Sequence, residues 1–440
     1  AYKDKPGGSE STTRRVGFTG TFNYTYDNRY FVDGSVRMDG ASTFGGTNKF
    51  APFWSVGAGW NLHKEKFIRN TGLFSTLRLR ASFGQTGSQQ FAPYESLTSY
   101  DFYLDDRYML WNGAKLKGHA NEDLKWQTTN QFNAGVEIGL WGNRLSFQVD
   151  VYNKKTIDLL STINVPTSTG FGTYTANIGE VRNRGFEGKI SGYLIRDTER
   201  QIMWSMTGNI THNVNEILEL SDAIKKQTAS AMQQDKDLAL LYEGESMTSI
   251  YAVPSLGVDP ATGSEIFLDR EGRPTYTWHA NSRRLAGNSE PKYRGNISTM
   301  FTYKNLTMNL SFGYQWGGQQ YNSTLKDRVE ISYDEGYANV DKRVYEERWM
   351  KPGDHSFYPK FSYEDTKSSS RFVQDDNVFS LQSVSLDYRN TGKWLRKMKV
   401  ESFNVAVNAS DLFYVSTIRR ERGTSYPFAR HATITFGFQF

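Results

Sequence analysis

The sequence predicts an all-β membrane protein in which antiparallel strands form the wall of a transmembrane β-barrel. Apolar and polar residues alternate along most of the chain, aromatic residues make up 15% of it, and long apolar runs do not occur. Successive side chains of a strand point to opposite faces, so this alternation gives each strand one apolar and one polar face. About ten such residues suffice for a tilted strand to cross a bilayer, whereas a transmembrane helix needs about eighteen or more apolar residues in a row.

The composition agrees with a barrel and argues against other classes. The chain has 440 residues, of which 38% are hydrophobic, and a mean hydropathy of -0.62. A barrel places its apolar residues at alternate positions, which keeps the mean hydropathy low. The net charge of +5 is too small to indicate a nucleic-acid-binding protein. Without cysteine, neither disulfides nor thiol chemistry is available.

The sequence contains no motif that indicates catalysis or metal binding. Its six histidines are scattered, and neither a zinc-protease motif, a nucleophile elbow nor a phosphate-binding loop occurs. Residues 257–274 begin with a GVDPATG turn, but Arg270 and Arg273 interrupt the acidic spacing that a calcium loop requires. We therefore predict a protein that is not an enzyme, with no cofactor and no metal.

The alternation predicts about thirteen strands. In the first strand, Phe18, Phe22 and Tyr24 share one face, while Thr19 and Thr21 point to the other. The predicted strands span residues 14–26, 30–38, 54–62, 77–83, 131–140, 145–151, 181–195, 201–212, 293–304, 306–316, 378–389, 399–413 and 430–440.

The last strand shows the pattern most clearly. Its apolar residues occupy every second position and end on an aromatic residue: Ile434, Phe436, Phe438 and Phe440. We expect Ile434 and Phe436 to face lipid. Phe436, Phe438 and Phe440 resemble the assembly signal that the outer-membrane insertion machinery reads, and we expect them to serve as one.

The connections between the strands alternate between short turns and long loops. The long loops lie near residues 85–125, 157–179, 213–292 and 317–377. Bacterial barrels have short periplasmic turns and long extracellular loops, so counting back from the last strand places residues 1–13 in the remnant of an extracellular loop. Residues 14–440 then form barrel wall.

The strand count and the first residues both predict further polypeptide. Bacterial barrels have an even number of strands, and an open edge in lipid costs several kcal/mol for each unpaired backbone group. About thirteen strands therefore require a further segment that completes the wall. The chain opens AYKDKPGGSE, which is not a signal peptide, so we expect preceding polypeptide as well.

Several segments together resemble the SusC/RagA family of TonB-dependent outer-membrane transporters of Bacteroidetes. The resemblance rests, in order along the chain, on residues 22–67, 77–87, 121–140, 143–160, 177–190 and 426–440. It implies the carboxy-terminal part of a 22-stranded plugged barrel. It also implies energy from a TonB complex, a SusD-like surface lipoprotein as a lid, and active import of oligosaccharides or oligopeptides across the bacterial outer membrane.

Four charged residues are candidates for contacts inside the barrel: Arg37, Arg78, Arg80 and Glu187. Each falls on the polar side of its strand. On the lipid side such charges would cost about 2–4 kcal/mol near the bilayer midplane. We therefore expect them to line the lumen or to contact the plug, the alternative being a solvated inner wall.

Five aromatic residues in the long loops are candidates for substrate binding: Tyr94, Tyr100, Tyr103, Trp111 and Trp278. Aromatic rings present flat apolar faces that can stack on a sugar or a peptide. The alternative is that they pack within their own loops or contact the lid. Residues 221–240 and 364–376 are polar, and we expect them to be mobile or locally helical loop segments.

Two other functions fit the strand pattern. A passive porin would share the barrel but lack a plug. A soluble or surface-bound β-rich adhesin would bury its apolar faces between two sheets. The resemblance to SusC/RagA transporters favours active import over both.

Overall fold

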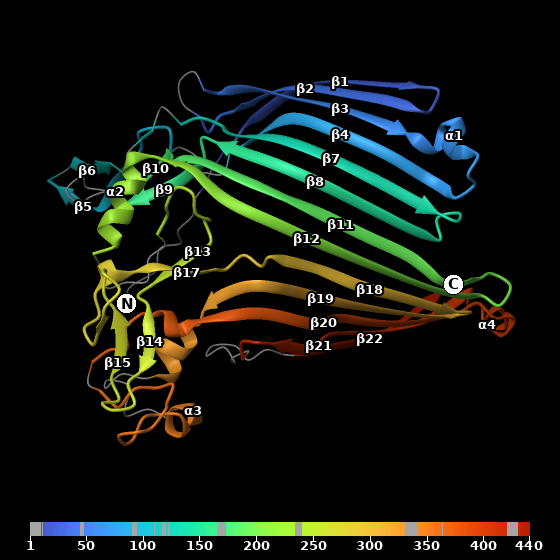
Figure 1. Cartoon of the computed structure of the whole chain (residues 1–440). Helices are drawn as coiled ribbons and strands as arrows, with labels where there is room; N and C mark the ends of the chain where they lie inside the picture. Colours follow the sequence, from blue (N-terminus) through green and yellow to red (C-terminus); the bar gives the residue numbers. More distant parts are fainter. Residues whose placement is uncertain are drawn as a thin grey trace.

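A thirteen-stranded antiparallel sheet dominates the structure, a computed structural model. The structure describes residues 10, 12–44, 48–89, 95–109, 111–116, 120–121, 124–164, 173–233, 240–330, 341–362, 364–419 and 430–440. The order of the strands in space follows their order in the sequence, and Figure 1 shows them side by side in one curved wall, from β1 in blue to β22 in red. The predicted all-β class and the predicted number of wall strands are confirmed.

Each wall strand pairs with the wall strand before it and the wall strand after it in the sequence. The wall strands are β1 (Arg15–Tyr26), β2 (Tyr30–Ala41), β3 (Phe50–Asn61), β4 (Phe74–Ser88), β7 (Gln127–Leu140), β8 (Leu145–Ile157), β11 (Gly179–Asp197), β12 (Ile202–Leu220), β18 (Tyr293–Tyr303), β19 (Leu306–Tyr321), β20 (Val373–Asn390), β21 (Ser402–Ser416) and β22 (His431–Gln439).

One face of the wall is apolar and remains exposed. Phe18 and Phe22 of β1 and Ile434 and Phe436 of β22 are all largely exposed on this face. Folded soluble proteins rarely leave a contiguous apolar surface of this extent uncovered. A bilayer covers such a face, which argues against a soluble β-rich adhesin.

Short turns connect the strands at one end of the wall. Asp27, Asn28 and Asn143 in these turns have φ angles of 49°, 53° and 58°, a left-handed conformation that Asp and Asn tolerate. The same end carries the helices η1 (Leu62–Lys64), α1 (Lys66–Arg69) and α4 (Lys393–Lys397), and the carboxy terminus lies there too.

Long loops connect the strands at the other end, where they fold into small sheets (Figure 1). The loop strands are β5 (Tyr100–Tyr108), β6 (Trp111–Leu116), β9 (Leu160–Asn164), β10 (Thr173–Asn177), β13 (Ser249–Ala252), β14 (Ser255–Val258), β15 (Glu265–Leu268), β16 (Pro274–Thr275) and β17 (Arg284–Asn288). The loop helices are α2 (Asp222–Ala231), η3 (Ala280–Ser282), η4 (Leu325–Val329), α3 (Lys342–Glu346) and η6 (Ser370–Phe372).

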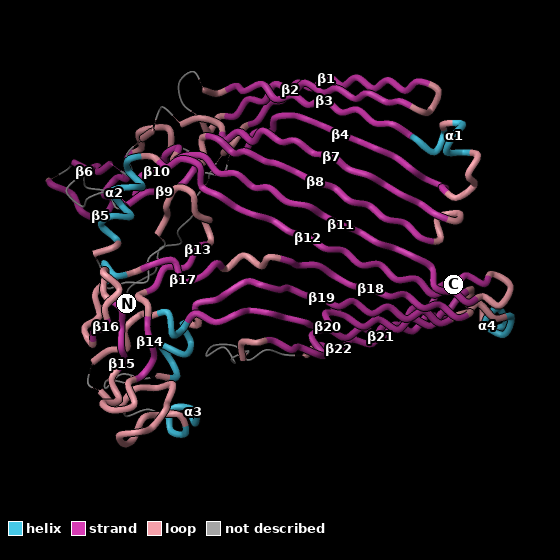
Figure 2. The backbone as a smooth tube through the Cα atoms, in the orientation of Figure 1, coloured by secondary structure: helices cyan, strands magenta, loops and turns pink. Residues whose placement is uncertain are grey.

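Helices occur only at the two ends of the wall, as Figure 2 shows for the described residues. Among those residues, none of the helices combines the length and the apolarity needed to cross a membrane.

The buried apolar residues also gather at the long-loop end. One cluster packs α2 against the upper parts of β11 and β12, with Ile217 only 1% exposed. A second cluster joins η4, α3 and η6 and comprises Leu325, Val329, Val344, Tyr358 and Phe372. The loops therefore have cores of their own, whereas the wall is a single layer.

Several strands run further toward the long-loop end than the sequence predicts. β12 continues to Leu220 and β19 to Tyr321, beyond the predicted ends at 212 and 316, and β20 begins at Val373. Above the bilayer the outward face need not be apolar, so the alternation fades while the strands continue. The prediction that 364–376 is a mobile or locally helical loop agrees with the helical turn η6 but is wrong for the last four residues, which are strand. Phe372 is fully buried, and β20 takes the residues that follow it.

The ladder between β12 and β18 is interrupted between Gly208 and Thr211. There the backbone N–H of Asn296 donates to the side-chain Oδ1 of Asn209 at 2.8 Å. The Tyr314 hydroxyl reaches over a glycine of β18 and donates to the carbonyl oxygen of Asn209 at 2.9 Å. Side chains thus satisfy backbone groups that the ladder leaves free at this seam.

β1 and β22 form the two edges of the sheet, and no pairing joins them within the described residues. In a membrane, the free backbone groups of such edges need partners. A further segment that completes the wall stays a prediction. Of the predicted loop remnant 1–13, residues 1–9 and 11 lie outside the described residues.

Candidate functional site: the polar face and the outer loop assembly

A row of cross-strand partners crosses the polar face of the wall. The row runs through Arg80, Gly135, Asp150, Glu187, Thr211, Arg294 and Gln315. Gly135 has no side chain, so Arg80 reaches across it to Asp150. The Arg80 NH2 group lies 2.6 and 2.8 Å from the two carboxylate oxygens. A glycine therefore permits an ion pair between strands that are not adjacent.

Two other arginines of the polar face, Arg78 and Arg37, also pair with side chains of the wall. Arg78 donates to Asn61 at 2.8 Å and lies 3.4 Å from the carboxylate of Glu137. Arg37 pairs with Asp39 at 2.5 Å. These contacts agree with a solvated inner wall whose charges neutralise one another. A role in binding a plug stays a prediction for both residues.

Glu187 differs from the three arginines because its carboxylate has no ion pair or hydrogen bond among the described residues. It lies between two hollows of the polar face, with volumes of about 570 and 500 Å³. Amide side chains line the larger hollow: Gln148, Asn209, Asn296, Gln315 and Gln382. Because amides donate and accept, this surface suits either a polar ligand or another protein segment inside the barrel.

The aromatic candidates do not form one site. Tyr100 and Trp111 lie on the β5–β6 hairpin, Tyr100 opposite Leu116 and Trp111 opposite Tyr108 beside the hairpin turn. Trp111 is 77% exposed. Tyr94 lies outside the described residues, as does the side chain of Tyr103. Figure 1 shows this hairpin and the β14–β16 sheet at different corners of the long-loop end.

Trp278 packs within the loops. Its indole N–H donates to the carbonyl oxygen of Ser368 at 2.8 Å. The cations of Arg283 and Lys367 lie 5.6 and 6.0 Å from its ring centre. These contacts favour the alternative in which this ring stabilises the loops, because the neighbouring cations occupy space that a stacked ligand would need.

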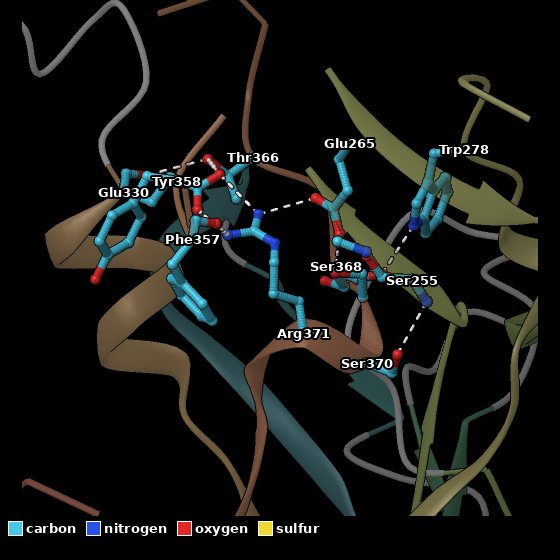
Figure 3. Close-up of polar contacts among 12 residues, drawn as sticks. Ser255, Glu265, Trp278, Glu330, Phe357, Tyr358, Thr366, Ser368, Ser370 and Arg371 are labelled. Atoms are coloured by element: carbon cyan, nitrogen blue, oxygen red, sulfur yellow. Dashed lines mark hydrogen bonds and ion pairs between the residues drawn. The ribbon is translucent and has the colours of Figure 1, made fainter. Parts of the chain in front are cut away.

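The strongest polar cluster at the long-loop end consists of Arg371, Glu265 and Glu330 (Figure 3), called here the Arg371 cluster. Arg371 lies 2.5 and 2.9 Å from the two oxygens of Glu330 and 2.8 Å from Glu265. The side chains are 4%, 5% and 8% exposed for Arg371, Glu330 and Glu265. Burial raises the pKa of Glu330 against the opposing effect of Arg371. Burial lowers the pKa of Arg371, but its carboxylate partners outweigh this and raise it overall.

The Arg371 cluster joins two long loops into one unit, the outer loop assembly, which comprises the described parts of residues 240–292 and 322–372. The indole N–H of Trp349 donates to Pro260 at 2.9 Å, and the backbone N–H of Ser370 donates to Val253 at 2.9 Å. Gly263, with a φ of 70°, lies directly beneath the Trp349 ring. The GVDPATG turn is thus a structural element that the other loop holds.

No local sequence pattern predicts the Arg371 cluster. Glu265 and Arg371 are separated by 106 residues, and each stands in a polar loop segment where a charge is normally solvated. Only the folding of one loop against the other brings them together. Sequence reasoning therefore missed this cluster of buried charged side chains.

A cavity of about 450 Å³, called here the loop cavity, lies beside the Arg371 cluster. Its lining includes Glu330, Tyr276, Trp278, Arg348, Lys360 and Lys367. Tyr276 is fixed by its hydroxyl, which donates to Asp259 at 2.7 Å. The hydrogen bond from Tyr276 is the main cause that lowers the pKa of Asp259.

A single-layer wall with an apolar face, a charged polar face and folded loops at one end defines an outer-membrane β-barrel protein. The chain belongs to the family described as TonB dependent receptor-like, beta-barrel, whose model matches residues 4–350. The family comprises receptors and transporters, which confirms that the chain is not an enzyme.

Similar proteins support the same assignment. The chain is 28% identical to TonB-dependent receptor P3 of Formosa agariphila, over 93% of this chain and 42% of that protein. It is 27% identical to TonB-dependent receptor SusC of Bacteroides thetaiotaomicron, over 86% of this chain and 38% of that protein. The chain thus spans less than half the length of these curated relatives.

A solved structure shows the same fold. The RagAB peptide transporter superposes with a TM-score of 0.80 at 23% sequence identity, over 92% of this chain and 44% of that chain. The resemblance to the SusC/RagA family and the predicted outer-membrane location are confirmed.

Proposed function

We propose that the chain forms the carboxy-terminal part of a TonB-dependent outer-membrane importer of oligomeric nutrients. The observation that carries the proposal is the family match across residues 4–350. The polar face adds support, because its charged and amide side chains can form hydrogen bonds with a polar solute that passes through the barrel. The apolar face cannot form such bonds. No bond is made or broken in this process. Binding at the outer loops precedes passage along the polar face.

The energy for import comes from a TonB complex that acts through polypeptide outside residues 1–440. Residues Arg37, Arg78, Arg80 and Glu187 face the lumen in this arrangement. Glu187 is the strongest candidate for a plug contact, because the other three are engaged within the wall. This assignment rests on the absence of a Glu187 partner among the described residues.

A SusD-like lipoprotein covers the extracellular mouth in this proposal. The β5–β6 hairpin is a candidate contact for it, since Met109 and Trp111 are 78% and 77% exposed at its turn. Apolar side chains this exposed on a loop hairpin fit a protein partner better than water. Tyr100, Tyr103 and Tyr94 belong to the same loop and share this candidate role with substrate binding.

The transported nutrient is an oligosaccharide or an oligopeptide. SusC and the RagAB peptide transporter are among the similar proteins.

Uptake measurements test the proposal. Cells that carry the complete transporter are supplied with labelled oligomers in the presence and absence of the TonB homologue. We expect deletion of the homologue to abolish uptake above the passive background. Uptake that continues unchanged would refute active transport and support a passive porin.

A further inference from the structure

Arg348 lines the loop cavity from a backbone segment that the fold holds in place. Its backbone forms a bridge with Tyr358, and the N–H of the next residue, Trp349, donates to the Tyr358 carbonyl at 3.0 Å. Tyr358 is only 1% exposed, so this bridge is anchored in the core of the outer loop assembly. The half-buried Arg348 guanidinium lies 5.7 Å from the ring centre of Phe361. The fold therefore anchors the backbone of Arg348, and the Phe361 ring lies beside its guanidinium.

The guanidinium of Arg348 has no hydrogen-bond acceptor and no ion-pair partner among the described residues. A guanidinium carries five N–H donors, and one that is partly buried normally has acceptors. Burial lowers the pKa of Arg348, which reflects a charge that the surroundings compensate incompletely. A hydrogen-bond acceptor from outside the chain would satisfy the N–H donors of Arg348 and compensate its charge.

Two carboxylates that line the loop cavity, those of Glu330 and Glu265, are already engaged with Arg371. Both oxygens of Glu330 accept from Arg371, at 2.5 and 2.9 Å. Glu265 accepts from Arg371 at 2.8 Å and from Ser369 at 2.6 Å. The charge of Glu330 still acts on Arg348 from a distance, but its oxygens are directed at Arg371. The Arg371 cluster thus leaves Arg348 available to a ligand.

We propose that the loop cavity binds a carboxylate of the imported oligomer, with Arg348 as its two-pronged donor. The planar fork of a guanidinium matches the two oxygens of a carboxylate, and such paired hydrogen bonds are stronger than neutral ones. This inference rests on the proposed import function and narrows its substrate class to oligomers that carry carboxylates.

The other charges of the cavity limit what kind of anion it takes. Glu364 and Asp365 also line the cavity, and both are exposed. They oppose a densely charged polyanion, while Lys360 and Lys367, which line the same cavity, offset their charge and leave the cation of Arg348 for an isolated carboxylate. The cavity therefore fits an oligomer with isolated carboxylates, such as a peptide with a free carboxy terminus or an oligosaccharide with uronic acid units.

Equilibrium binding to the purified complete transporter tests this proposal. The probes are a tetrapeptide and its carboxy-terminally amidated form, and a uronic acid tetrasaccharide and its carboxyl-reduced form. We expect at least one carboxylate probe to bind more tightly than its neutral counterpart. Arg348→Gln should lower the affinity for that probe about tenfold to a hundredfold and leave the neutral counterpart unchanged. Whichever carboxylate probe responds identifies the source of the carboxylate.

Two further variants separate recognition from folding. Arg348→Lys keeps the charge but not the fork, so we expect a loss smaller than that of Arg348→Gln. Arg270→Gln removes an exposed arginine of the same loop assembly outside the cavity, and its affinities should equal those of the wild type. Equal binding of acidic and neutral probes, or full affinity in Arg348→Gln, would overturn the proposal. A transporter that takes up no probe in energised cells would instead contradict the proposed function.

Discussion

Removal of Arg371 should make the outer loop assembly open locally more often while the wall remains folded. Arg371→Leu would leave Glu265 and Glu330, which are 8% and 5% exposed, as two buried carboxylates without their cation. Breaking a buried ion pair by removing one partner costs about 3–5 kcal/mol. Since about 1.4 kcal/mol corresponds to a factor of ten, local opening should become roughly a hundredfold to several thousandfold more frequent.

Hydrogen exchange followed by mass spectrometry measures this effect. Backbone amides in residues 253–268 and 341–372 should lose protection by that factor in Arg371→Leu, while amides of the wall strands keep theirs. Arg273→Gln is the matched control, because Arg273 is 72% exposed and its pairs with Asp269 and Glu271 are solvated. Exposed pairs contribute about 0–1 kcal/mol, so this variant should change protection by less than about tenfold.

Replacing all three residues of the Arg371 cluster by neutral ones distinguishes two costs. One is the lost attraction between Arg371 and its carboxylates, and the other is the cost of leaving buried carboxylates unpaired. Glu265→Gln and Glu330→Gln combined with Arg371→Leu removes the buried charges together, and we expect this triple variant to recover part of the lost protection. If Arg371→Leu leaves exchange in both segments within a factor of three of the wild type, the cluster does not hold the loops together.

Three further outcomes are expected. Burial raises the pKa of Glu330, so above the ordinary glutamate pKa the folded assembly binds more protons than the open one. Its stability should therefore fall as the pH rises through the window above that ordinary pKa. Hydrogen exchange of the outer loop assembly, corrected for its intrinsic pH dependence, should show this fall in stability with pH, and Glu330→Gln should reduce the fall. Gly263→Ala should lower protection in residues 257–264 by about 1–3 kcal/mol, since the new methyl group meets the Trp349 ring at a φ of 70°. Retained protection would contradict the tight contact. Tyr314→Phe should lower the stability of the wall by about 0.5–1.5 kcal/mol, measured by denaturant unfolding in detergent, because it removes the bond to Asn209. An unchanged midpoint would show that this bond does not stabilise the β12–β18 seam.

The sequence predicted the wall well because lipid imposes a simple rule. Within the bilayer every outward side chain must be apolar, so strands such as β1 and β22 can be read from alternation alone. The rule ends at the membrane surface. β19 continues through Gly317–Tyr321 without apolar alternation, and its end was therefore predicted too early.

Strand alternation predicts the face of the wall on which a residue lies, but it does not predict contacts between two loops that are far apart in the sequence. The position of Arg80 on the polar face follows from strand parity, but its partner Asp150 depends on the glycine that lies between them. Trp278 was a ligand candidate because isolated aromatic residues in loops suggest binding, yet its neighbours come from segments far along the chain. Contacts of that kind have no periodic signature.

The length of β11 and β12 has a consequence for the electrical surroundings of the loop cavity. Each strand has 19 residues, or about 60 Å of extended chain. A strand tilted by about 45° needs only about 40 Å to cross the hydrocarbon layer. At that tilt the remaining length adds only about 14 Å of height, which is roughly the thickness of the two headgroup layers together. The ends of β11 and β12 thus reach the membrane surface, and any further distance between Arg348 and the charge of the headgroups is set by the loops rather than by the strands.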